Sequence, residues 1–173
     1  SPRRRLLICS CVTMKGTRIL LVDDFEDARE MYTTYLQFDG FDVLTASTAV
    51  EAIRMAVAER PDLILMDAGL PGMTGWDAII ALKEDDRTRD IPVLMLTGHV
   101  LRESQERAAE AGADGFIPKP CLPDELSREI RHALKARSSR SGETEKEQQK
   151  RTRTAGAETR ARLRRARARK ERS

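Results

Sequence analysis

The sequence predicts an α/β fold in which a parallel, doubly wound sheet has helices on both faces. Two observations carry this prediction. Between residues 17 and 137, short apolar runs alternate with amphipathic stretches, which is the pattern of strands linked by helices. Most of these runs are rich in Ile, Leu and Val, as expected for strands that are covered on both faces.

Five runs are expected to form the strands of this sheet, because each is short, mostly apolar and followed by polar or turn-forming residues. They are Arg18–Val22, Phe41–Ala46, Leu63–Met66, Val93–Thr97 and Gly115–Ile117.

The segments between the strands carry apolar residues at helical spacing, and the first two such stripes should face the sheet. These stripes are Ala28, Met31, Tyr32, Tyr35 and Leu36, then Ala49, Ala52, Ile53, Ala56 and Val57. A third helix is expected from about Trp76 to Glu84, with Trp76 packing at its start. The fifth helix is marked by Leu122, Leu126, Ile130 and Leu134.

The fourth helix is expected at Ser104 to Ala111, and alanines are its main apolar residues. It should therefore bury little apolar area, at about 25 cal/mol per Å², and be the most loosely held element. A loosely held helix suits a moving part.

The charge of the chain is unevenly distributed and divides it into three segments. Residues 17–137 hold 14 Lys and Arg against 23 Asp and Glu, a net charge of −9, whereas residues 138–173 hold 13 against 5, a net charge of +8. The last segment has Leu163 as its largest apolar residue, so it cannot bury enough surface to offset its ordering entropy. We expect a flexible leader at 1–16, one folded domain at 17–137 and a disordered basic tail at 138–173.

The cysteines and the hydropathy pattern bear on the compartment. Cys9, Cys11 and Cys121 have neither the spacing of zinc ligands nor that of a disulfide framework, which favours a reducing cytoplasm. No apolar run is long enough to span a membrane. Residues 3–12 faintly resemble a signal peptide, but their apolar part is short and no cleavage pattern follows. We interpret them as a disordered leader or as the result of a start site upstream of Met14.

Reactive side chains follow the predicted strands. Asp67 comes directly after the third strand and shortly before a Gly-Leu-Pro-Gly sequence, and Asp23 and Asp24 come directly after the first. Thr97 ends the fourth strand, and Lys119 follows the fifth. Since parallel strands place their carboxyl ends at one edge of a sheet, these residues are expected to share one pocket.

The residue types in this pocket indicate a particular chemistry. Three converging carboxylates repel one another unless a divalent cation neutralises them, and a site of few carboxylates is typical of Mg²⁺, whereas a transition metal would favour His or Cys. A carboxylate beside Mg²⁺ and the Lys119 ammonium group can attack a phosphoryl donor in line. The Thr97 hydroxyl can donate a hydrogen bond to the transferred group. The sequence thus predicts an aspartate that becomes phosphorylated.

Four motifs in this order resemble the receiver domain of two-component response regulators. They are Asp23-Asp24, the run Asp67-Ala-Gly-Leu-Pro-Gly-Met-Thr-Gly, Thr97-Gly98 and Lys119-Pro120. The resemblance covers roughly residues 17–137. It implies a flavodoxin-like (βα)5 fold with strand order 2-1-3-4-5.

The resemblance also implies roles for the metal and phosphoryl site. Asp67 would be the phosphoacceptor and Asp24 a direct Mg²⁺ ligand. Asp23 would act mainly through bound water, and the backbone carbonyl of Gly69 would complete the metal shell. Lys119 would pair with the phosphoryl group.

Further roles concern the switch and its partners. The peptide before Pro120 would be cis, Thr97 would be the switch hydroxyl and Phe116 the ring that rotates inward. A histidine kinase or phosphotransfer protein would supply the phosphoryl group, so the chain's own chemistry would be limited to self-catalysed phosphotransfer and autodephosphorylation. A downstream protein would bind the face of helix four, strand five and helix five. Gly69, which has no side chain, and His99 leave the lifetime of the phosphorylated state open.

Each motif has a simpler structural interpretation. Asp23 and Asp24 could cap the first helix, and Asp67 could be a turn residue. Lys119 could be a solvated surface lysine, and Phe116 a core aromatic that does not switch.

Other functions are also compatible with the fold class. A pseudo-receiver would bind partners without phosphorylation. An aspartate-nucleophile phosphatase would place a second acid where Gly69 stands, and a flavin- or nucleotide-binding protein would place a Gly-rich loop after the first strand. The basic tail could attract nucleic acid nonspecifically, with a steep salt dependence, but it lacks interleaved aromatic residues and any DNA-binding fold.

Overall fold

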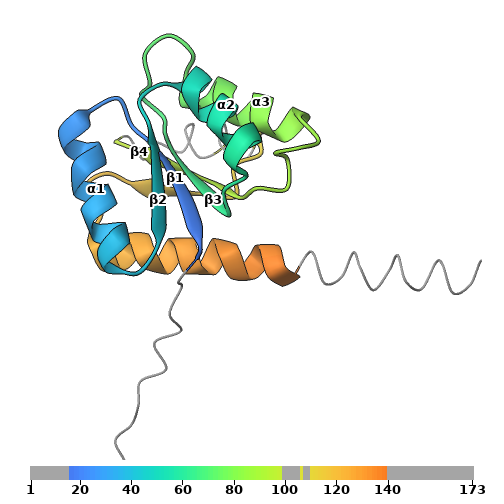
Figure 1. Cartoon of the computed structure of the whole chain (residues 1–173). Coiled ribbons are helices and arrows are strands. Elements are labelled where there is room, and N and C mark those ends of the chain that lie inside the picture. Colours follow the sequence, from blue (N-terminus) through green and yellow to red (C-terminus); the bar gives the residue numbers. More distant parts are fainter. Residues whose placement is uncertain (1–15, 99–105, 107–109, 140–173) are drawn as a thin grey trace, which may run out of the picture. The chain divides into compact units, whose positions relative to one another are not determined.

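The computed structural model of the chain describes residues 16–98, 106 and 110–139. The described residues are coloured along the sequence in Figure 1. The chain divides into two compact units, Ser1–Leu134 and Lys135–Ser173. Three predicted features lie outside the described residues: the leader up to residue 15, His99 with most of the fourth helix, and the tail from residue 140. Of the fourth helix, Glu106, Glu110 and Ala111 are described and are helical.

The first unit contains a parallel sheet of five strands in the order β2-β1-β3-β4-β5, as predicted. The strands are β1 (Arg18–Val22), β2 (Asp42–Ala46), β3 (Leu63–Asp67), β4 (Val93–Thr97) and β5 (Gly115–Pro118). Every residue of β3 and β4 is buried. This burial explains why their sequences are continuous apolar runs that do not alternate with polar residues.

Helices cover both faces of this sheet. They are α1 (Glu26–Phe38), α2 (Ala49–Glu59), α3 (Gly75–Glu84) and a last helix over 123–139, whose residues from 135 belong to the second unit. Successive strand residues point to opposite faces, so Leu20 and Ile64 join a core under α2 and α3, whereas Ile19 and Leu65 join a core under α1 and the last helix. The two cores hold the sheet rigid, and with it the strand ends.

The sequence also fixes where the helices on one face begin. Thr48 caps α2 by accepting a hydrogen bond from the backbone of Glu51. Thr74 and Asp77 form a reciprocal capping box at the start of α3. Such caps satisfy backbone N–H groups that have no partner inside the helix.

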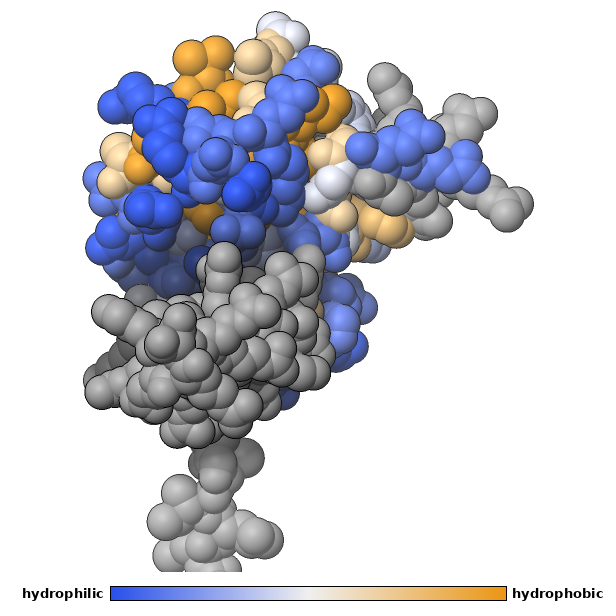
Figure 2. All heavy atoms as spheres, turned by 90° about the vertical axis from the view of Figure 1, so that its right-hand side faces the viewer, coloured by the Kyte–Doolittle hydropathy of each residue, from blue (hydrophilic) through white to orange (hydrophobic). Residues whose placement is uncertain are grey.

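The face shown in Figure 2 is mostly hydrophilic, with hydrophobic side chains in between. On α2 and α3, the exposed large apolar residues are Val50 and Ile80.

The predicted inward stripe of α1 is only partly correct. Tyr32 and Leu36 are buried, but Met31 and Tyr35 are 41% and 38% exposed. Compared with the predicted stripe, the inward face of α1 is shifted toward Arg29, which is half-buried and whose guanidinium donates to the Asp23 carbonyl at 2.8 Å. The outer flank of α1 therefore carries exposed apolar side chains.

Leu122 does not belong to the inward stripe of the last helix either, because it is 66% exposed. The helix begins one residue later, and the Leu122 backbone N–H donates to the Glu125 carboxylate at 3.2 Å. Leu126 and Ile130 are buried and Leu134 is partly buried, as predicted. Ser138 and Ser139, which we assigned to the tail, are helical.

Two polar contacts join elements that are distant in sequence. The Lys83 ammonium binds the Asp114 carboxylate at 2.8 Å and the Ile91 carbonyl at 2.9 Å, which ties the end of α3 to the segment before β5. On the other face, Asp39 accepts hydrogen bonds from Ser127 and Arg131 and so links the end of α1 to the last helix. Neither contact was predicted from the sequence, because each joins residues that are more than 30 positions apart or lie on different helices.

No helix in the described ranges combines the length and apolar character needed to cross a membrane. Cys121 is a buried free thiol.

Candidate functional site

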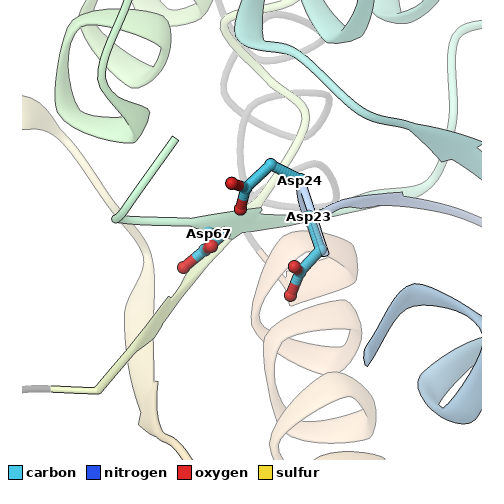
Figure 3. Close-up of side chains that lie close together, drawn as sticks. All are labelled: Asp23, Asp24 and Asp67. Carbon is cyan, nitrogen blue, oxygen red and sulfur yellow. The ribbon is translucent and has the colours of Figure 1, made fainter. Parts of the chain in front are cut away.

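The acidic residues predicted to share a pocket are gathered at the carboxyl edge of the sheet. Asp23 and Asp24 follow β1, and Asp67 ends β3. One carboxylate oxygen from each of these three residues lies within 4.8 Å of the other two (Figure 3). Segments 43 residues apart in sequence thus meet because β1 and β3 are neighbouring parallel strands.

Asp23 is the most deeply buried of the three acids, with 1% of its surface exposed. One of its oxygens accepts the Phe25 backbone N–H at 2.9 Å, and the other accepts the Lys119 ammonium at 2.6 Å. Both oxygens are thus engaged by the protein, as a buried carboxylate requires. Asp24 is the exposed member of the cluster.

Lys119 connects the acidic cluster to the end of β5. Its ammonium lies 2.6 Å from Asp23 and 3.2 Å from Asp67. Burial alone would lower the pKa of Lys119, but the hydrogen bond to Asp23 and the negative charges of Asp67 and Asp23 outweigh it, so the pKa of Lys119 is raised. The amine therefore stays protonated at neutral pH and supplies a fixed positive charge in the pocket.

Asp67 lies at the centre of the site and is 8% exposed. Its Oδ1 accepts the Gly69 backbone N–H at 3.2 Å in addition to the contact with Lys119. The position of a Cβ on Gly69 would be 3.8 Å from the nearer Asp67 carboxylate oxygen. Because glycine has no side chain, Gly69 leaves one side of this carboxylate open.

Thr97 lies on β4, the neighbour of the strand that carries Asp67, and Phe116 lies on β5, one strand further along the sheet. Thr97 ends β4 and is 6% exposed, and its carbonyl accepts the Lys119 backbone N–H at 2.7 Å. Phe116 is partly buried against the core under α2 and α3. The Lys119–Pro120 peptide bond is cis, as predicted. All the predicted site residues thus lie at or near one edge of the sheet.

The donor set fits Mg²⁺. Three carboxylates offer hard oxygen ligands close together, and one positive charge from Lys119 does not balance them. Asp23 has both oxygens engaged by Lys119 and Phe25, whereas Asp24 is exposed toward solvent.

Gly75 ends the run from Asp67 that carries the family resemblance, but it was assigned no role from the sequence. A Cβ on Gly75, the first residue of α3, would be only 2.1 Å from the backbone carbonyl oxygen of Asp67. The sequence does contain a signal for the start of this helix, since Thr74 and Asp77 have the spacing of a capping box. It contains no signal for the contact between residues 75 and 67.

This fold and site define a class of protein. Residues 19–131 match the family model of the response regulator receiver domain. The chain belongs to this family.

Curated relatives and solved structures agree with this assignment. The chain is 39% identical over 132 residues to the phosphate regulon transcriptional regulatory protein PhoB of Pseudomonas aeruginosa, a match that covers 76% of the chain and 57% of PhoB. The chain therefore spans little more than half the length of this relative.

Among solved structures, chemotaxis protein CheY4 of Vibrio cholerae matches with a TM-score of 0.66 and 32% identity, over 68% of this chain and 98% of that one. The receiver domain of a Pseudomonas aeruginosa sensor histidine kinase matches with a TM-score of 0.65 and 29% identity, over 69% and 98% of the two chains. That structure has a magnesium ion coordinated in its active site cleft.

Proposed function

We propose that residues 17–137 are a phosphorylation switch in which Asp67 accepts a phosphoryl group. The observation that carries this proposal is the position of the Lys119 ammonium, 3.2 Å from Asp67 and beside a cluster of three acids. A solvated surface lysine and an aspartate that only forms a turn would have no reason to lie this close together. Family membership and the similarity to PhoB support the same function.

The chemical step is an in-line displacement. An Asp67 carboxylate oxygen attacks the phosphorus of a phosphohistidine or of a small acyl phosphate. The new P–O bond forms while the bond to the donor breaks, and its electron pair leaves with the donor nitrogen or oxygen. Lys119 offsets the negative charge on the equatorial oxygens, and the Thr97 hydroxyl donates to one of them.

Asp24, Asp67 and the Gly69 carbonyl would hold Mg²⁺ directly, with Asp23 acting through a water molecule. The cation, when bound, supplies positive charge that brings the phosphoryl oxygens and the carboxylate together. The engagement of both Asp23 oxygens by Phe25 and Lys119 supports the indirect role of Asp23.

Phosphorylation would act by shifting a conformational equilibrium. Thr97 moves toward the phosphoryl group, Phe116 rotates into the space behind it, and the face formed by β5 and the neighbouring helices changes its partner. The phosphodonor would be a histidine kinase or phosphotransfer protein in the cytoplasm. The similarity to a magnesium-bound receiver domain of a histidine kinase supports the choice of metal and of signalling system.

A beryllofluoride titration tests this function. Beryllofluoride with Mg²⁺ mimics an aspartyl phosphate, and we expect it to change the fluorescence of Trp76, which lies at the start of α3, nine residues after Asp67. Asp67→Asn should abolish the change, and Asp90→Asn, at an exposed position in the loop before β4, should retain it. A pseudo-receiver would give no beryllofluoride response in any of the three proteins.

A further inference from the structure

The start of α3 lies directly against the peptide unit that carries Asp67. A Cβ built on Gly75 would lie 2.1 Å from the Asp67 carbonyl oxygen, 3.0 Å from the Asp67 carbonyl carbon and 3.1 Å from the Ala68 Cα. Carbon atoms that do not bond prefer separations of about 3.5–4.0 Å. Any side chain at position 75 must therefore move either α3 or the backbone between Asp67 and Ala68.

Neither partner in this contact can move freely. The Asp67–Ala68 segment is fixed on its other side, where the Ala68 N–H donates to the Leu96 carbonyl at 2.9 Å. On the side of α3, Ala78 and Ile79 are fully buried against the core. The Asp67 backbone is thus enclosed between β4 and the first turn of α3.

A capping box holds the first turn of α3 in place. Thr74 Oγ1 accepts the Asp77 N–H at 3.3 Å, and the Asp77 carboxylate accepts the Thr74 N–H at 3.3 Å and its hydroxyl at 2.7 Å. These bonds keep Gly75 at the first helical position, next to the phosphoacceptor.

We propose that Gly75, held by the Thr74–Asp77 capping box, is a positioning residue for phosphoryl transfer. Because Gly75 has no side chain, the α3 backbone can pack directly against the Asp67 peptide. This packing keeps the Asp67 carboxylate in line with Lys119 and the metal ligands. This inference rests on the proposed function. A reacting group displaced by about 1 Å can lose about 100-fold in rate, so small movements of this peptide matter.

Loss of the cap tests the inference without a steric clash. Thr74→Ala loosens the first turn of α3, and Thr48→Ala removes the side-chain cap of α2, a helix that follows β2, which is two strands away from β3 in the sheet. Both variants should lose similar stability in urea. With saturating Mg²⁺ and acetyl phosphate, Thr74→Ala should be phosphorylated at least threefold more slowly than wild type, and Thr48→Ala at close to the wild-type rate.

A second pair of variants tests the contact itself. Gly75→Ala should be phosphorylated at least tenfold more slowly than wild type. The double variant Gly75→Ala/Ala68→Gly should be phosphorylated at least threefold faster than Gly75→Ala, because glycine at position 68 lets the displaced peptide rotate back. A protein that merely lost packing would not be rescued by removing another side chain.

The outcomes separate the two claims. If wild type accepts no phosphoryl group, the proposed function fails and the inference fails with it. If wild type is phosphorylated and Thr74→Ala and Thr48→Ala react at the same rate, only the inference is overturned. This comparison decides the question even if Gly75→Ala does not fold.

Discussion

Lys119 and Lys83 are two half-buried lysines with the same side-chain exposure, 22%, but different surroundings. Lys119 binds two carboxylates of the pocket, and Lys83 binds Asp114 and backbone carbonyls at the opposite end of β5. Removing either lysine takes the ammonium partner from a carboxylate that lies mostly out of solvent and also accepts a backbone N–H, so both removals should cost stability. Only Lys119 also faces the phosphoacceptor, and this difference allows stability and phosphoryl transfer to be measured separately.

We predict that Lys119→Met and Lys83→Met each lower the free energy of unfolding by about 1–3 kcal/mol. Only Lys119→Met should also slow phosphorylation, by at least tenfold, because it removes the charge that faces the transferred group. Urea unfolding and the rate of acyl phosphate formation measure the two effects. Equal phosphorylation rates in the two variants would show that Lys119 is a structural residue.

Cys121 provides a residue-scale test of the core beside the site. Burial raises the pKa of its thiol, and its Sγ lies 3.8 Å from the Tyr32 hydroxyl. At about pH 8 the thiol should be mostly protonated as well as inaccessible. We predict that iodoacetamide alkylates Cys121 at least tenfold more slowly in the native protein than in urea.

Peptide mapping by mass spectrometry distinguishes Cys121 from Cys9 and Cys11 in this experiment. Equal alkylation rates with and without urea would mean that the loop after β5 opens freely.

The reactive residues were predictable from the sequence, whereas the backbone contact that holds Asp67 in place was not. Asp23, Asp67 and Thr97 could be grouped because each lies at the carboxyl end of a recognisable strand. Gly75 could not be assigned a role, because its contact with the Asp67 carbonyl depends on the exact path of the loop between them. The exposure of Met31 was missed for a similar reason, since helical spacing does not fix how a helix is rotated about its axis.

At the scale of elements, one polar contact joins α1 to the last helix. Asp39, just after α1, accepts hydrogen bonds from Ser127, which is 5% exposed, and from Arg131. We predict that Asp39→Ala lowers the free energy of unfolding by about 1–3 kcal/mol, because it leaves the buried Ser127 hydroxyl without this acceptor.

Arg131→Ala should cost only about 0–1 kcal/mol, because this partner is solvent-exposed and such ion pairs are weak. Urea unfolding, with and without beryllofluoride, measures the free energy of unfolding of both variants. An Asp39→Ala protein as stable as wild type would show that the two helices are held by apolar packing alone.

The strands were predicted almost to the residue, and the helix boundaries less well. Continuous apolar runs bounded by polar residues mark buried parallel strands clearly. The start of β2 and the ends of β3 and β5 differ from the prediction by one residue each. The start of α3 was also placed one residue late, at Trp76, although Thr74 and Asp77 signal the cap. Which residues of α1 are buried could not be read from helical spacing, because Arg29 lies half-buried on one flank while Met31 and Tyr35 on the other are exposed.

At the scale of the whole molecule, the acidic cluster couples metal binding to stability. A ligand that binds only the folded state stabilises it by an amount that rises with its concentration, about 2.7 kcal/mol at 100 times the dissociation constant. We therefore predict that Mg²⁺ raises the melting temperature of wild type relative to EDTA, since folding brings the three carboxylates within 4.8 Å.

Asp24→Asn should lose most of this stabilisation, whereas Asp62→Asn, which lies at the other end of the sheet just before β3, should keep it. Differential scanning fluorimetry measures the shift. The same increase in melting temperature in wild type and Asp24→Asn would place the metal elsewhere.

Intact-mass spectrometry after incubation with acetyl phosphate tests the central claim most directly. With Mg²⁺, wild type should gain the mass of one phosphoryl group, and hydroxylamine should remove it, as expected for an acyl phosphate. Without Mg²⁺ the gain should disappear, and Asp67→Asn should gain nothing under either condition. Phosphorylation of Asp67→Asn to the same extent as wild type would contradict the assignment of Asp67 as the phosphoacceptor.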